Sequence, residues 1–343
     1  MRAVLLDQHG PADNLRYVTD HPIPDPGAGM VRLRVRAAAL NRLDIWVRDG
    51  WPGIRLPLPH ILGADAAGDV DAVGPYVEGW TPGERAVVNP GISCGYCDEC
   101  LGGRANLCAH FGILGEDMAG TYAEYIVVPA RNLLRLPAHV SYAEAAAASL
   151  VFLTAWHSLI TAGGLRPGER VLIVGAGGGV NSASIQVARY AGARVLVVGS
   201  SAEKLEQARA LGAEVTIDRS AEDWSKAVFR LTERQGVDVV VDNVGAETLF
   251  GSIRALRRGG RILIVGNTSG PRTEIDLRYV FGKHIRLIGS TMAPHQDFVT
   301  VMRLIFEGKL RPVVGASFPL ERAADAHRAL ESGAVFGKIV LEV

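Results

Sequence analysis

The stretch from Val171 to Asn181, Val-Leu-Ile-Val-Gly-Ala-Gly-Gly-Gly-Val-Asn, constrains the fold of this chain more than any other. Its opening apolar run is mostly β-branched, which is typical of a strand buried on both faces of a parallel sheet. The glycines let the backbone turn tightly and approach a ligand. Ser182 to Ala191 then has helical spacing and stops at Gly192. Glycine runs also occur in surface loops, but strand, glycine turn and helix in this order predict a site for a dinucleotide pyrophosphate.

The chain after this loop alternates apolar strands with amphipathic helices. This alternation predicts an α/β fold with a doubly wound parallel sheet, here of six strands. Before the loop, Ser141 and Glu144 have the spacing of a capping box that begins a helix. The further strands are expected at 194–198, 215–217, 237–241, 261–265 and 285–289, and helices at 143–148, 154–160, 203–211, 224–232 and 248–256.

The beginning and end of the chain follow a different pattern. Residues 1 to about 90 carry short strand-like runs separated by Pro and Gly, such as Val31–Ala37, 67–74 and 85–88, which indicate a compact, barrel-like β domain. After about residue 290 the chain returns to helices and a closing strand at 338–343. A length of 343 residues also favours two domains over one.

All four cysteines lie in one short segment, as Cys94, Cys97, Cys100 and Cys108. Thiolates two residues apart can converge on one tetrahedral ion, and four of them close the site of a structural zinc. The alternative is two disulfides or inert thiols, but three cysteines at this spacing pair poorly as disulfides. We therefore expect one structural zinc held by these four side chains.

Charge and hydropathy exclude some classes of partner. The 36 basic and 36 acidic residues leave no net charge, which argues against nucleic acid or an anionic membrane as the main partner. The apolar run after Met1 is too short for a signal peptide, and no run approaches the ~18 apolar residues of a membrane span. We expect a soluble, cytoplasmic protein.

The second strand of the predicted sheet informs the choice of cofactor. NAD-binding sheets carry an acidic residue about 20 positions after the glycines, whereas this strand ends in Gly199-Ser200-Ser201, with Lys204 shortly after. A 2′-phosphate would not be repelled, and Ser200, Ser201 and Lys204 can donate to it. Arg219 could approach from beyond the third strand. Alternatively the serines only cap the next helix and Lys204 is solvated. The pattern favours NADPH over NADH.

Taken together, several motifs resemble the medium-chain dehydrogenase/reductase superfamily, which includes zinc alcohol dehydrogenases and quinone oxidoreductases. The resemblance spans the whole chain. It rests on the four-cysteine segment, the glycine loop, Gly63-Ala64-Asp65-Ala66-Ala67-Gly68, Gly120-Thr121-Tyr122-Ala123-Glu124-Tyr125, Leu153-Thr154-Ala155-Trp156 and Phe336-Gly337-Lys338-Ile339-Val340.

The resemblance implies a GroES-like β-barrel catalytic domain, residues 1–150 and 290–343, with the zinc lobe at about 91–112. A Rossmann domain, residues 151–289, is inserted into it. A homodimer or homotetramer is also implied, often paired through the last strand of the sheet. The expected cofactor contacts, in addition to the serines, Lys204 and Arg219, are Gly175, Gly177, Gly178, Gly179, Val180, Asn243, Gly266, Asn267 and, by family analogy, Lys338.

The chain departs from zinc alcohol dehydrogenases where their catalytic zinc is bound. Asn41 stands in place of a cysteine, Ala64 in place of a histidine, and Leu150 at the third ligand position. Leu43 replaces the hydroxyl of the usual proton relay. The resemblance therefore implies that the structural zinc is retained and the catalytic zinc is lost. A non-standard metal site at His60 and Asp65 is a minor alternative.

The missing ligands limit the chemistry. Lowering the pKa of an alcohol from about 16 to about 7 is worth roughly 12 kcal/mol, which a neutral Asn41 cannot supply. An enolate needs only hydrogen-bond donors, each worth about 3–4 kcal/mol. We expect an NADPH-dependent reductase of a quinone or activated alkene, with Asn41 as candidate donor to the substrate oxygen; alternatively its amide only ties down its own loop. The other candidates are a zinc-type alcohol dehydrogenase with unusual ligands and an NADPH-binding protein, crystallin-like or nucleic-acid-binding, that has no turnover.

Overall fold

The computed structural model describes residues 1–51 and 54–343. The chain forms two compact units. The split unit comprises Met1–Leu153 and Ala293–Val343, and the inserted unit comprises Thr154–Met292. Both junctions lie three residues beyond the positions expected from the sequence.

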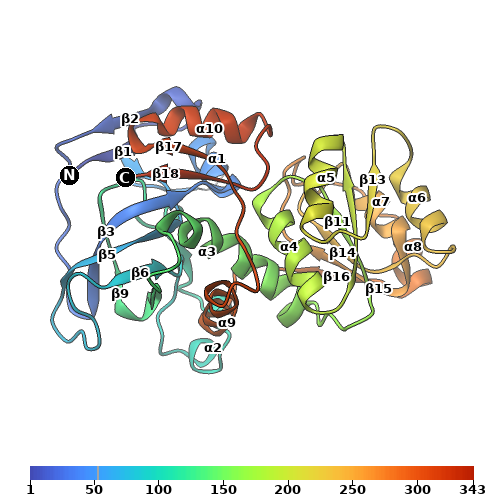
Figure 1. Ribbon diagram of the computed structural model, residues 1–343, viewed down its shortest axis with the longest axis horizontal. Helices are drawn as coiled ribbons and strands as arrows, with labels where there is room; N and C mark the ends of the chain where they lie inside the picture. The colour runs from blue at the N-terminus through green and yellow to red at the C-terminus, as the bar shows by residue number, and fades with distance from the viewer. Residues whose placement is uncertain (52–53) are drawn as a thin grey trace. The chain divides into compact units, whose positions relative to one another are not determined.

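The inserted unit contains a parallel sheet of six strands in the order β13-β12-β11-β14-β15-β16 (Figure 1). This confirms the doubly wound fold. The order reverses between β11 and β14, and ligands of such sheets bind at the carboxyl ends of the strands beside this reversal. The strands are β11 (Arg170–Val174), β12 (Arg194–Gly199), β13 (Val215–Asp218), β14 (Val237–Asp242), β15 (Leu256–Ile264) and β16 (Arg286–Gly289), and the helices are α4 (Gly179–Tyr190), α5 (Ala202–Ala210), α6 (Trp224–Leu231), α7 (Leu249–Ala255) and α8 (Leu277–Lys283).

The split unit is built on antiparallel strands, in agreement with the expected GroES-like fold. Its largest sheet has the order β10-β6-β5-β3-β18-β17, with β9 also paired to β3, and smaller sheets join β2-β1-β4 and β7-β8. The strands are β1 (Ala3–Leu6), β2 (Leu15–Val18), β3 (Met30–Ala39), β4 (His60–Ile61), β5 (Asp65–Val73), β6 (Arg85–Val88), β7 (Gly91–Ile92), β8 (Gly112–Ile113), β9 (Tyr125–Pro129), β10 (Leu133–Arg135), β17 (Val314–Pro319) and β18 (Lys338–Glu342).

Helices of the split unit lie in both of its segments (Figure 1). The α-helices are α1 (Arg42–Asp49), α2 (Asp98–Leu101), α3 (Tyr142–Trp156), α9 (His295–Phe306) and α10 (Ala323–Glu331), and single 3₁₀ turns lie at Ala12–Asn14, Ala105–Leu107, Ala130–Asn132 and Leu320–Arg322.

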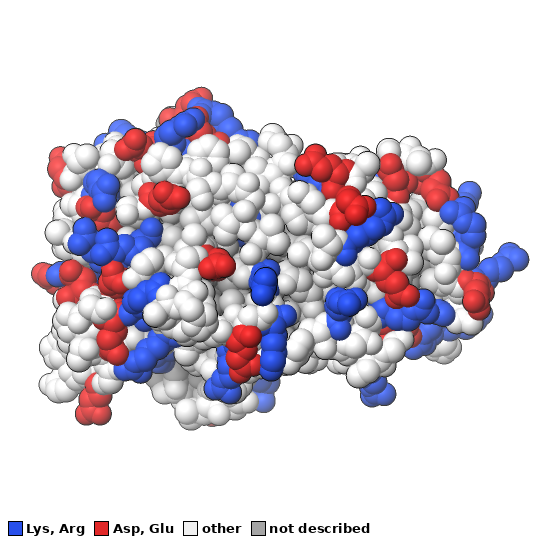
Figure 2. Space-filling view, viewed as in Figure 1, with Lys and Arg blue, Asp and Glu red and all other residues white. Residues whose placement is uncertain are grey.

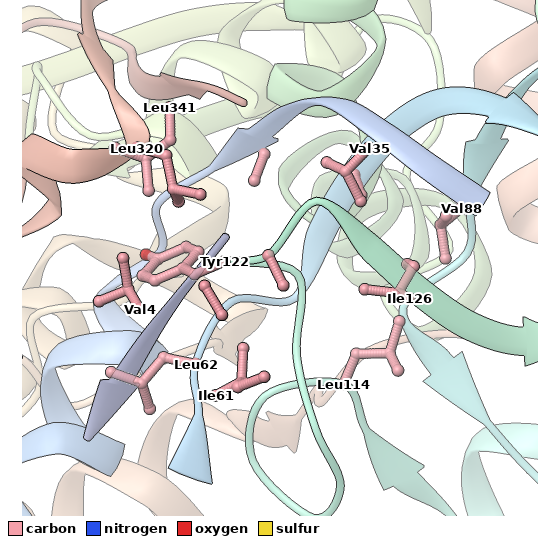
Figure 3. Close-up of a cluster of buried hydrophobic side chains, with 14 of the residues drawn as sticks. Val4, Val35, Ile61, Leu62, Val88, Leu114, Tyr122, Ile126, Leu320 and Leu341 are labelled. Atoms are coloured by element: carbon pink, nitrogen blue, oxygen red, sulfur yellow. The ribbon is translucent and has the colours of Figure 1, made fainter. Parts of the chain in front are cut away.

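The core of the split unit joins the two ends of the chain. Tyr122 is fully buried there, among Val4, Leu62 and Leu320 (Figure 3). The closing strand β18 lies between β3 and β17, pairing antiparallel with the first and parallel with the second. Residues more than 270 positions apart along the chain are therefore neighbours in this sheet.

The helix α3 begins at the predicted capping box. The Ser141 N–H donates to Glu144 Oε2 over 3.0 Å, and the Glu144 N–H donates to Ser141 Oγ over 3.2 Å. The helix continues into a π-helical turn, His157–Ala162. Tyr142–Ala162 therefore has 21 residues and is long and apolar enough to span a membrane, so the expectation that no run approaches this length is wrong. However, 78% of its most apolar window is buried, as in a core helix.

Acidic and basic side chains are interspersed over the face shown in Figure 2. Many form exposed ion pairs, such as Arg194 with Glu214 and Arg230 with Glu222, both at 2.8 Å. Such exposed pairs contribute little to stability, because water screens the two charges. The surface therefore carries a mixed charge.

Candidate active site and metal centre

The glycine loop turns directly after β11. Gly175 has φ +106°, and a Cβ atom there would lie 2.5 Å from Asn181 Nδ2. Only glycine adopts this conformation at low cost and leaves room for the Asn181 amide. Gly175, the first glycine of the loop, is therefore required by the backbone conformation.

The helix α4 begins three residues earlier than expected. Gly178 is its N-cap, so Gly179, Val180 and Asn181 form the first turn instead of a loop. The reason is a tertiary contact, because the Asn243 Nδ2 group donates to Asn181 Oδ1 over 2.8 Å and fixes this side chain in the helix. The N–H groups of a first helical turn lack intrahelical acceptors and favour an anion. The N–H groups at the start of α4 are therefore suited to bind a pyrophosphate.

Lys204 lies beside the glycine loop. A Cβ atom on Gly177 would be 2.9 Å from Lys204 Cδ and 3.3 Å from Lys204 Nζ, so the side chain crosses the glycine loop. Ser201 is the N-cap of α5 and its Oγ accepts from the Lys204 N–H at 3.4 Å. Capping, the alternative interpretation of the serines, therefore applies to Ser201, while Ser200 is exposed.

The neighbouring strand end carries a carboxylate that the sequence reasoning missed. Asp218, the last residue of β13, is the ladder partner of Gly199. Its Oδ1 accepts from the N–H and hydroxyl of Ser220, at 2.8 and 2.6 Å. Arg219 is exposed, and its backbone N–H donates to Gly199 O over 2.8 Å. The end of β12 therefore lies next to one acid and one base.

The remaining cofactor candidates of the inserted unit meet at the ends of β14 and β15. Asn243 follows β14 and holds Asn181. A Cβ atom on Gly266 would lie 3.0 Å from Asn243 O, and one on Gly245 would lie 3.0 Å from Asn267 Cα. These contacts bring Asn243, Gly266 and Asn267 together with the first turn of α4.

The four cysteines form one cluster. Their Sγ atoms all lie within 4.8 Å of one another, with Cys94 at 3.8 Å from Cys100 and 3.6 Å from Cys108. Tetrahedral Zn–S bonds of about 2.3 Å place sulfurs about 3.8 Å apart, so the arrangement fits zinc. All four are free thiols, which excludes the disulfide alternative in this structure. The donor set is closed and suits a structural zinc.

A buried ion pair occupies the region where a catalytic zinc would be bound. The Lys338 Nζ group donates to Asp65 Oδ2 over 2.9 Å and to Asn41 Oδ1 over 2.6 Å. The side chains of Lys338 and Asp65 are only 4% and 0% exposed. Asn41 Nδ2 also donates to Asp65 Oδ2, over 2.9 Å, and the Leu150 N–H donates to Asp65 Oδ1 over 2.8 Å. Both oxygens of Asp65 are therefore occupied.

A catalytic zinc does not fit these residues. Asn41, Ala64 and Leu150 are all buried and offer neither sulfur nor imidazole. A zinc ion would also have to displace the Lys338 ammonium from Asp65. Lys338, which family analogy assigned to the cofactor, has its amine in this network of the split unit. The amide of Asn41 is held by Asp65 and, at 3.4 Å, by Ala39 O, as the alternative interpretation of this residue expects.

A second buried carboxylate lies behind Asn41. Asp44 Oδ2 accepts from the Asn41 N–H at 2.7 Å and from the Tyr122 hydroxyl at 3.0 Å. Burial raises the pKa of Asp44 to about 6. This capping box fixes the start of α1, and therefore the position of the Asn41 side chain.

The minor alternative of a metal at His60 is not supported by the geometry. His60 Nε2 lies 3.1 Å from Gly115 O, and burial lowers the pKa of this imidazole. Within residues 1–51 and 54–343, the four cysteines are the one group of three or more His, Cys, Asp or Glu side chains placed to share a metal.

Comparisons with known proteins agree with the architecture. Residues 27–138 match the alcohol dehydrogenase GroES-like domain family, and residues 179–307 match the zinc-binding dehydrogenase family. An NAD-dependent alcohol dehydrogenase of Saccharolobus solfataricus is 32% identical over 350 residues, covering 99% of each chain. A crotonyl-CoA reductase of Streptomyces avermitilis is 32% identical, covering 93% of this chain and 81% of that protein. A crystal structure described as an NAD-dependent alcohol dehydrogenase is 49% identical, with a TM-score of 0.96 and 100% coverage of both chains. The chain therefore belongs to the medium-chain dehydrogenase/reductase superfamily and is an NAD(P)-dependent oxidoreductase.

Proposed function

We propose that this oxidoreductase uses NADPH to reduce an activated alkene or a quinone, without a catalytic zinc. The observation that carries the proposal is the buried Lys338–Asp65 ion pair beside Asn41. It puts an ammonium group beside Asn41, a position at which the resemblance implies a zinc ligand in the zinc alcohol dehydrogenases. The crotonyl-CoA reductase relative is named for an alkene substrate of this class.

The energetics favour an alkene or quinone over an alcohol. Without a metal, ionising an alcohol at neutral pH costs roughly 12 kcal/mol, since its pKa must fall from about 16 to about 7. An enone that accepts hydride at its β-carbon spreads the charge over an enolate. One or two hydrogen-bond donors, each worth about 3–4 kcal/mol, supply most of the stabilisation that this enolate needs.

Asn41 is our candidate donor to the substrate oxygen. Its bond from Nδ2 to Ala39 O is long, at 3.4 Å, so this N–H is weakly used and is free to donate to a substrate carbonyl that approaches on the same side. The other N–H stays on Asp65 and fixes the amide plane. Donation from Lys338 to Asn41 Oδ1 polarises the amide and strengthens its N–H groups as donors.

The choice of NADPH rests on the inserted unit. When bound, the nicotinamide supplies the hydride. The strand β12 ends at Gly199 without a carboxylate of its own, although Asp218 ends the neighbouring strand β13, and Lys204 crosses the glycine loop. Both features suit a 2′-phosphate. Two of the relatives described above carry NAD in their names, so the proposal of NADPH rests on the residues of this chain alone.

Zinc content and substrate class test the proposal together. The purified protein is analysed for zinc per chain. It is then assayed for NADPH oxidation with cyclohex-2-enone and 1,4-benzoquinone, and for NADP⁺ reduction with primary and secondary alcohols. We expect one zinc and turnover of the enone or quinone. Two zincs with alcohol turnover would instead establish the alcohol dehydrogenase alternative, and cofactor binding without turnover would favour a non-enzymatic role.

We also propose a homodimer or homotetramer in which β16 pairs with a second copy. In the described chain β16 is the edge strand and pairs with β15 on one side only. Leu287 on this strand is 39% exposed, and Leu277 and Phe281 on α8 are 68% and 70% exposed. An exposed apolar edge strand is suited to pairing with another chain. Sedimentation velocity of the wild type and of Leu287→Lys tests this proposal, since the charge should shift the protein towards monomer.

A further inference from the structure

The side chain of Asn181 lies in the first turn of α4, and only one end of its amide is used. Asn181 is 5% exposed, and its Oδ1 accepts from Asn243 Nδ2 over 2.8 Å. Its own Nδ2 group donates to no residue within the part of the chain that the structure describes. Nearly all polar groups of residues this buried are paired in native proteins. The unused N–H groups of Asn181 therefore indicate an acceptor that a ligand supplies.

This amide nitrogen lies over the glycine loop. A Cβ atom on Gly175 would be 2.5 Å from Asn181 Nδ2, and one on Gly178 would be 3.9 Å from it. Gly175 directly follows β11, and Gly178 is the N-cap of α4. The backbone N–H groups of the first helical turn, which lack intrahelical acceptors, lie in the same short segment. The Nδ2 group is therefore a side-chain donor placed among backbone donors.

The amide of Asn181 is oriented by a rigid support at the end of β14. Asp242, the last residue of this strand, is 1% exposed. Its Oδ1 accepts from the N–H groups of Val244 and Gly245, both at 3.0 Å. These bonds fix the backbone that carries Asn243, whose Nδ2 holds the oxygen of the Asn181 amide. With its oxygen held in this way, the amide keeps its nitrogen over the glycine loop.

We propose that Asn181 Nδ2 donates a hydrogen bond to the pyrophosphate of the nicotinamide cofactor, and that Asn243 is a positioning residue that acts through Asn181. A pyrophosphate is an anion whose oxygens accept hydrogen bonds, so it suits a turn that presents side-chain and backbone N–H groups together. NADPH and NADH carry the same pyrophosphate. The inference therefore extends the proposed function without depending on the choice between these cofactors or on the substrate.

The test compares Asn181→Asp with Asn181→Ala in the full-length, zinc-loaded protein. Aspartate has the same shape and keeps an oxygen that accepts from Asn243, but it replaces the N–H donor with a negatively charged oxygen. A carboxylate is also favourable in the first turn of a helix, so this variant should fold. Gln186→Glu introduces the same charge further along α4 and is the matched control. Thermal denaturation of each variant checks its fold.

Isothermal titration calorimetry measures the affinity for three ligands that share the pyrophosphate. NADPH is the complete cofactor, NADH lacks the 2′-phosphate, and ADP-ribose lacks the 2′-phosphate and the nicotinamide. We expect Asn181→Ala to weaken binding of all three by about 10- to 100-fold, the loss of one hydrogen bond to a charged group. Asn181→Asp should weaken binding further, because its carboxylate repels the phosphates. Gln186→Glu should bind all three as the wild type does.

The positioning role of Asn243 has its own readout. Asn243→Ala should weaken binding of the same three ligands, because the Asn181 amide is then no longer held. The double variant Asn181→Ala/Asn243→Ala should bind about as well as Asn181→Ala alone, since the second residue acts only through the first. Losses that add fully in the double variant would show that Asn243 acts independently, and this part of the inference would be wrong.

Other outcomes would overturn the contact with the pyrophosphate. If Asn181→Asp binds as tightly as the wild type, the amide faces no anion, since a carboxylate is tolerated beside a ribose hydroxyl. If ADP-ribose binding is unchanged while NADPH and NADH binding weakens, the contact lies at the nicotinamide. Failure of the proposed function is distinguishable, because a protein that prefers NADH or reduces no alkene would still show equal losses for NADH and ADP-ribose.

Discussion

The ammonium nitrogen of Lys338 lies 2.9 Å from the carboxylate of Asp65, although 273 positions separate the two residues along the chain. Both side chains are almost completely buried, and Asn41 bridges them. The pair thus joins the last strand of the chain to the start of β5. Its energetics can be tested directly.

Lys338→Met should lower the free energy of unfolding by about 3–5 kcal/mol, because it leaves the Asp65 carboxylate buried without its cation. Urea denaturation measures the loss. The double variant Lys338→Met/Asp65→Leu should recover much of it, since no unpaired charge remains. Arg230→Met, which breaks the exposed pair with Glu222, is the control and should lower the free energy of unfolding far less, because water already screens this pair. Equal losses in the two single variants would contradict the assignment of a buried pair.

His327 should make the protein less stable in acid. Burial, and then the Arg48 guanidinium, lower the pKa of His327 to about 3, from 6.5 for an exposed imidazole. Between these values the unfolded chain binds a proton that the folded chain does not. Stability therefore falls as the pH falls below 6.5, by up to about 1.4 kcal/mol per pH unit from this group.

Urea denaturation at pH 7, 6 and 5 checks this expectation by comparing the wild type with His327→Gln. The variant should show a shallower loss, since glutamine does not titrate. Asp44, whose pKa burial raises to about 6, contributes with the opposite sign, but it is present in both proteins and cancels in the difference. Parallel curves for the two proteins would count against the prediction.

Cys97→Ser should abolish binding of the structural zinc. Four sulfurs within 4.8 Å of one another form the closed site, and three leave it incomplete. We expect metal analysis to fall from one zinc per chain to none, with faster amide exchange in residues 91–112. His110→Gln is the matched control, since its backbone N–H contacts Cys108 while its side chain stands outside the ligand group. Retention of zinc in Cys97→Ser would refute the four-cysteine site.

Lys204→Ala should weaken NADPH binding by about 1–3 kcal/mol and barely change NADH binding, since only NADPH carries the 2′-phosphate. Fluorescence titration with each cofactor measures both affinities. Lys226→Ala, on the exposed surface of α6, should change neither. Equal losses for NADPH and NADH in Lys204→Ala would show that the lysine does not recognise the 2′-phosphate.

Local sequence patterns were sufficient to predict the strand–glycine–helix unit and the cysteine cluster. The run Val171–Val174 and the spacing from Cys94 to Cys108 lie in short segments, where neighbouring residues set the geometry. The start of α4 was wrong by three residues because the Asn181–Asn243 contact, 62 positions apart, extends the helix. Propensity alone carries no information on such a contact.

Local sequence patterns could not predict the polar network of the candidate site. The sequence indicated which zinc ligands were missing at Asn41, Ala64 and Leu150. It did not indicate that Lys338 would pair with Asp65, because sheet pairing of β18 with β3 brings the two together.

The position of β18 between β3 and β17 also orders events during protein synthesis. The ribosome emits the whole inserted unit, residues 154–292, before it reaches the strand that completes the largest sheet of the split unit. The inserted unit can therefore fold while translation continues, whereas the first 153 residues must wait for the final segment. Because Lys338 arrives with that segment, the polar network around Asp65 assembles last, and a truncated chain lacks it.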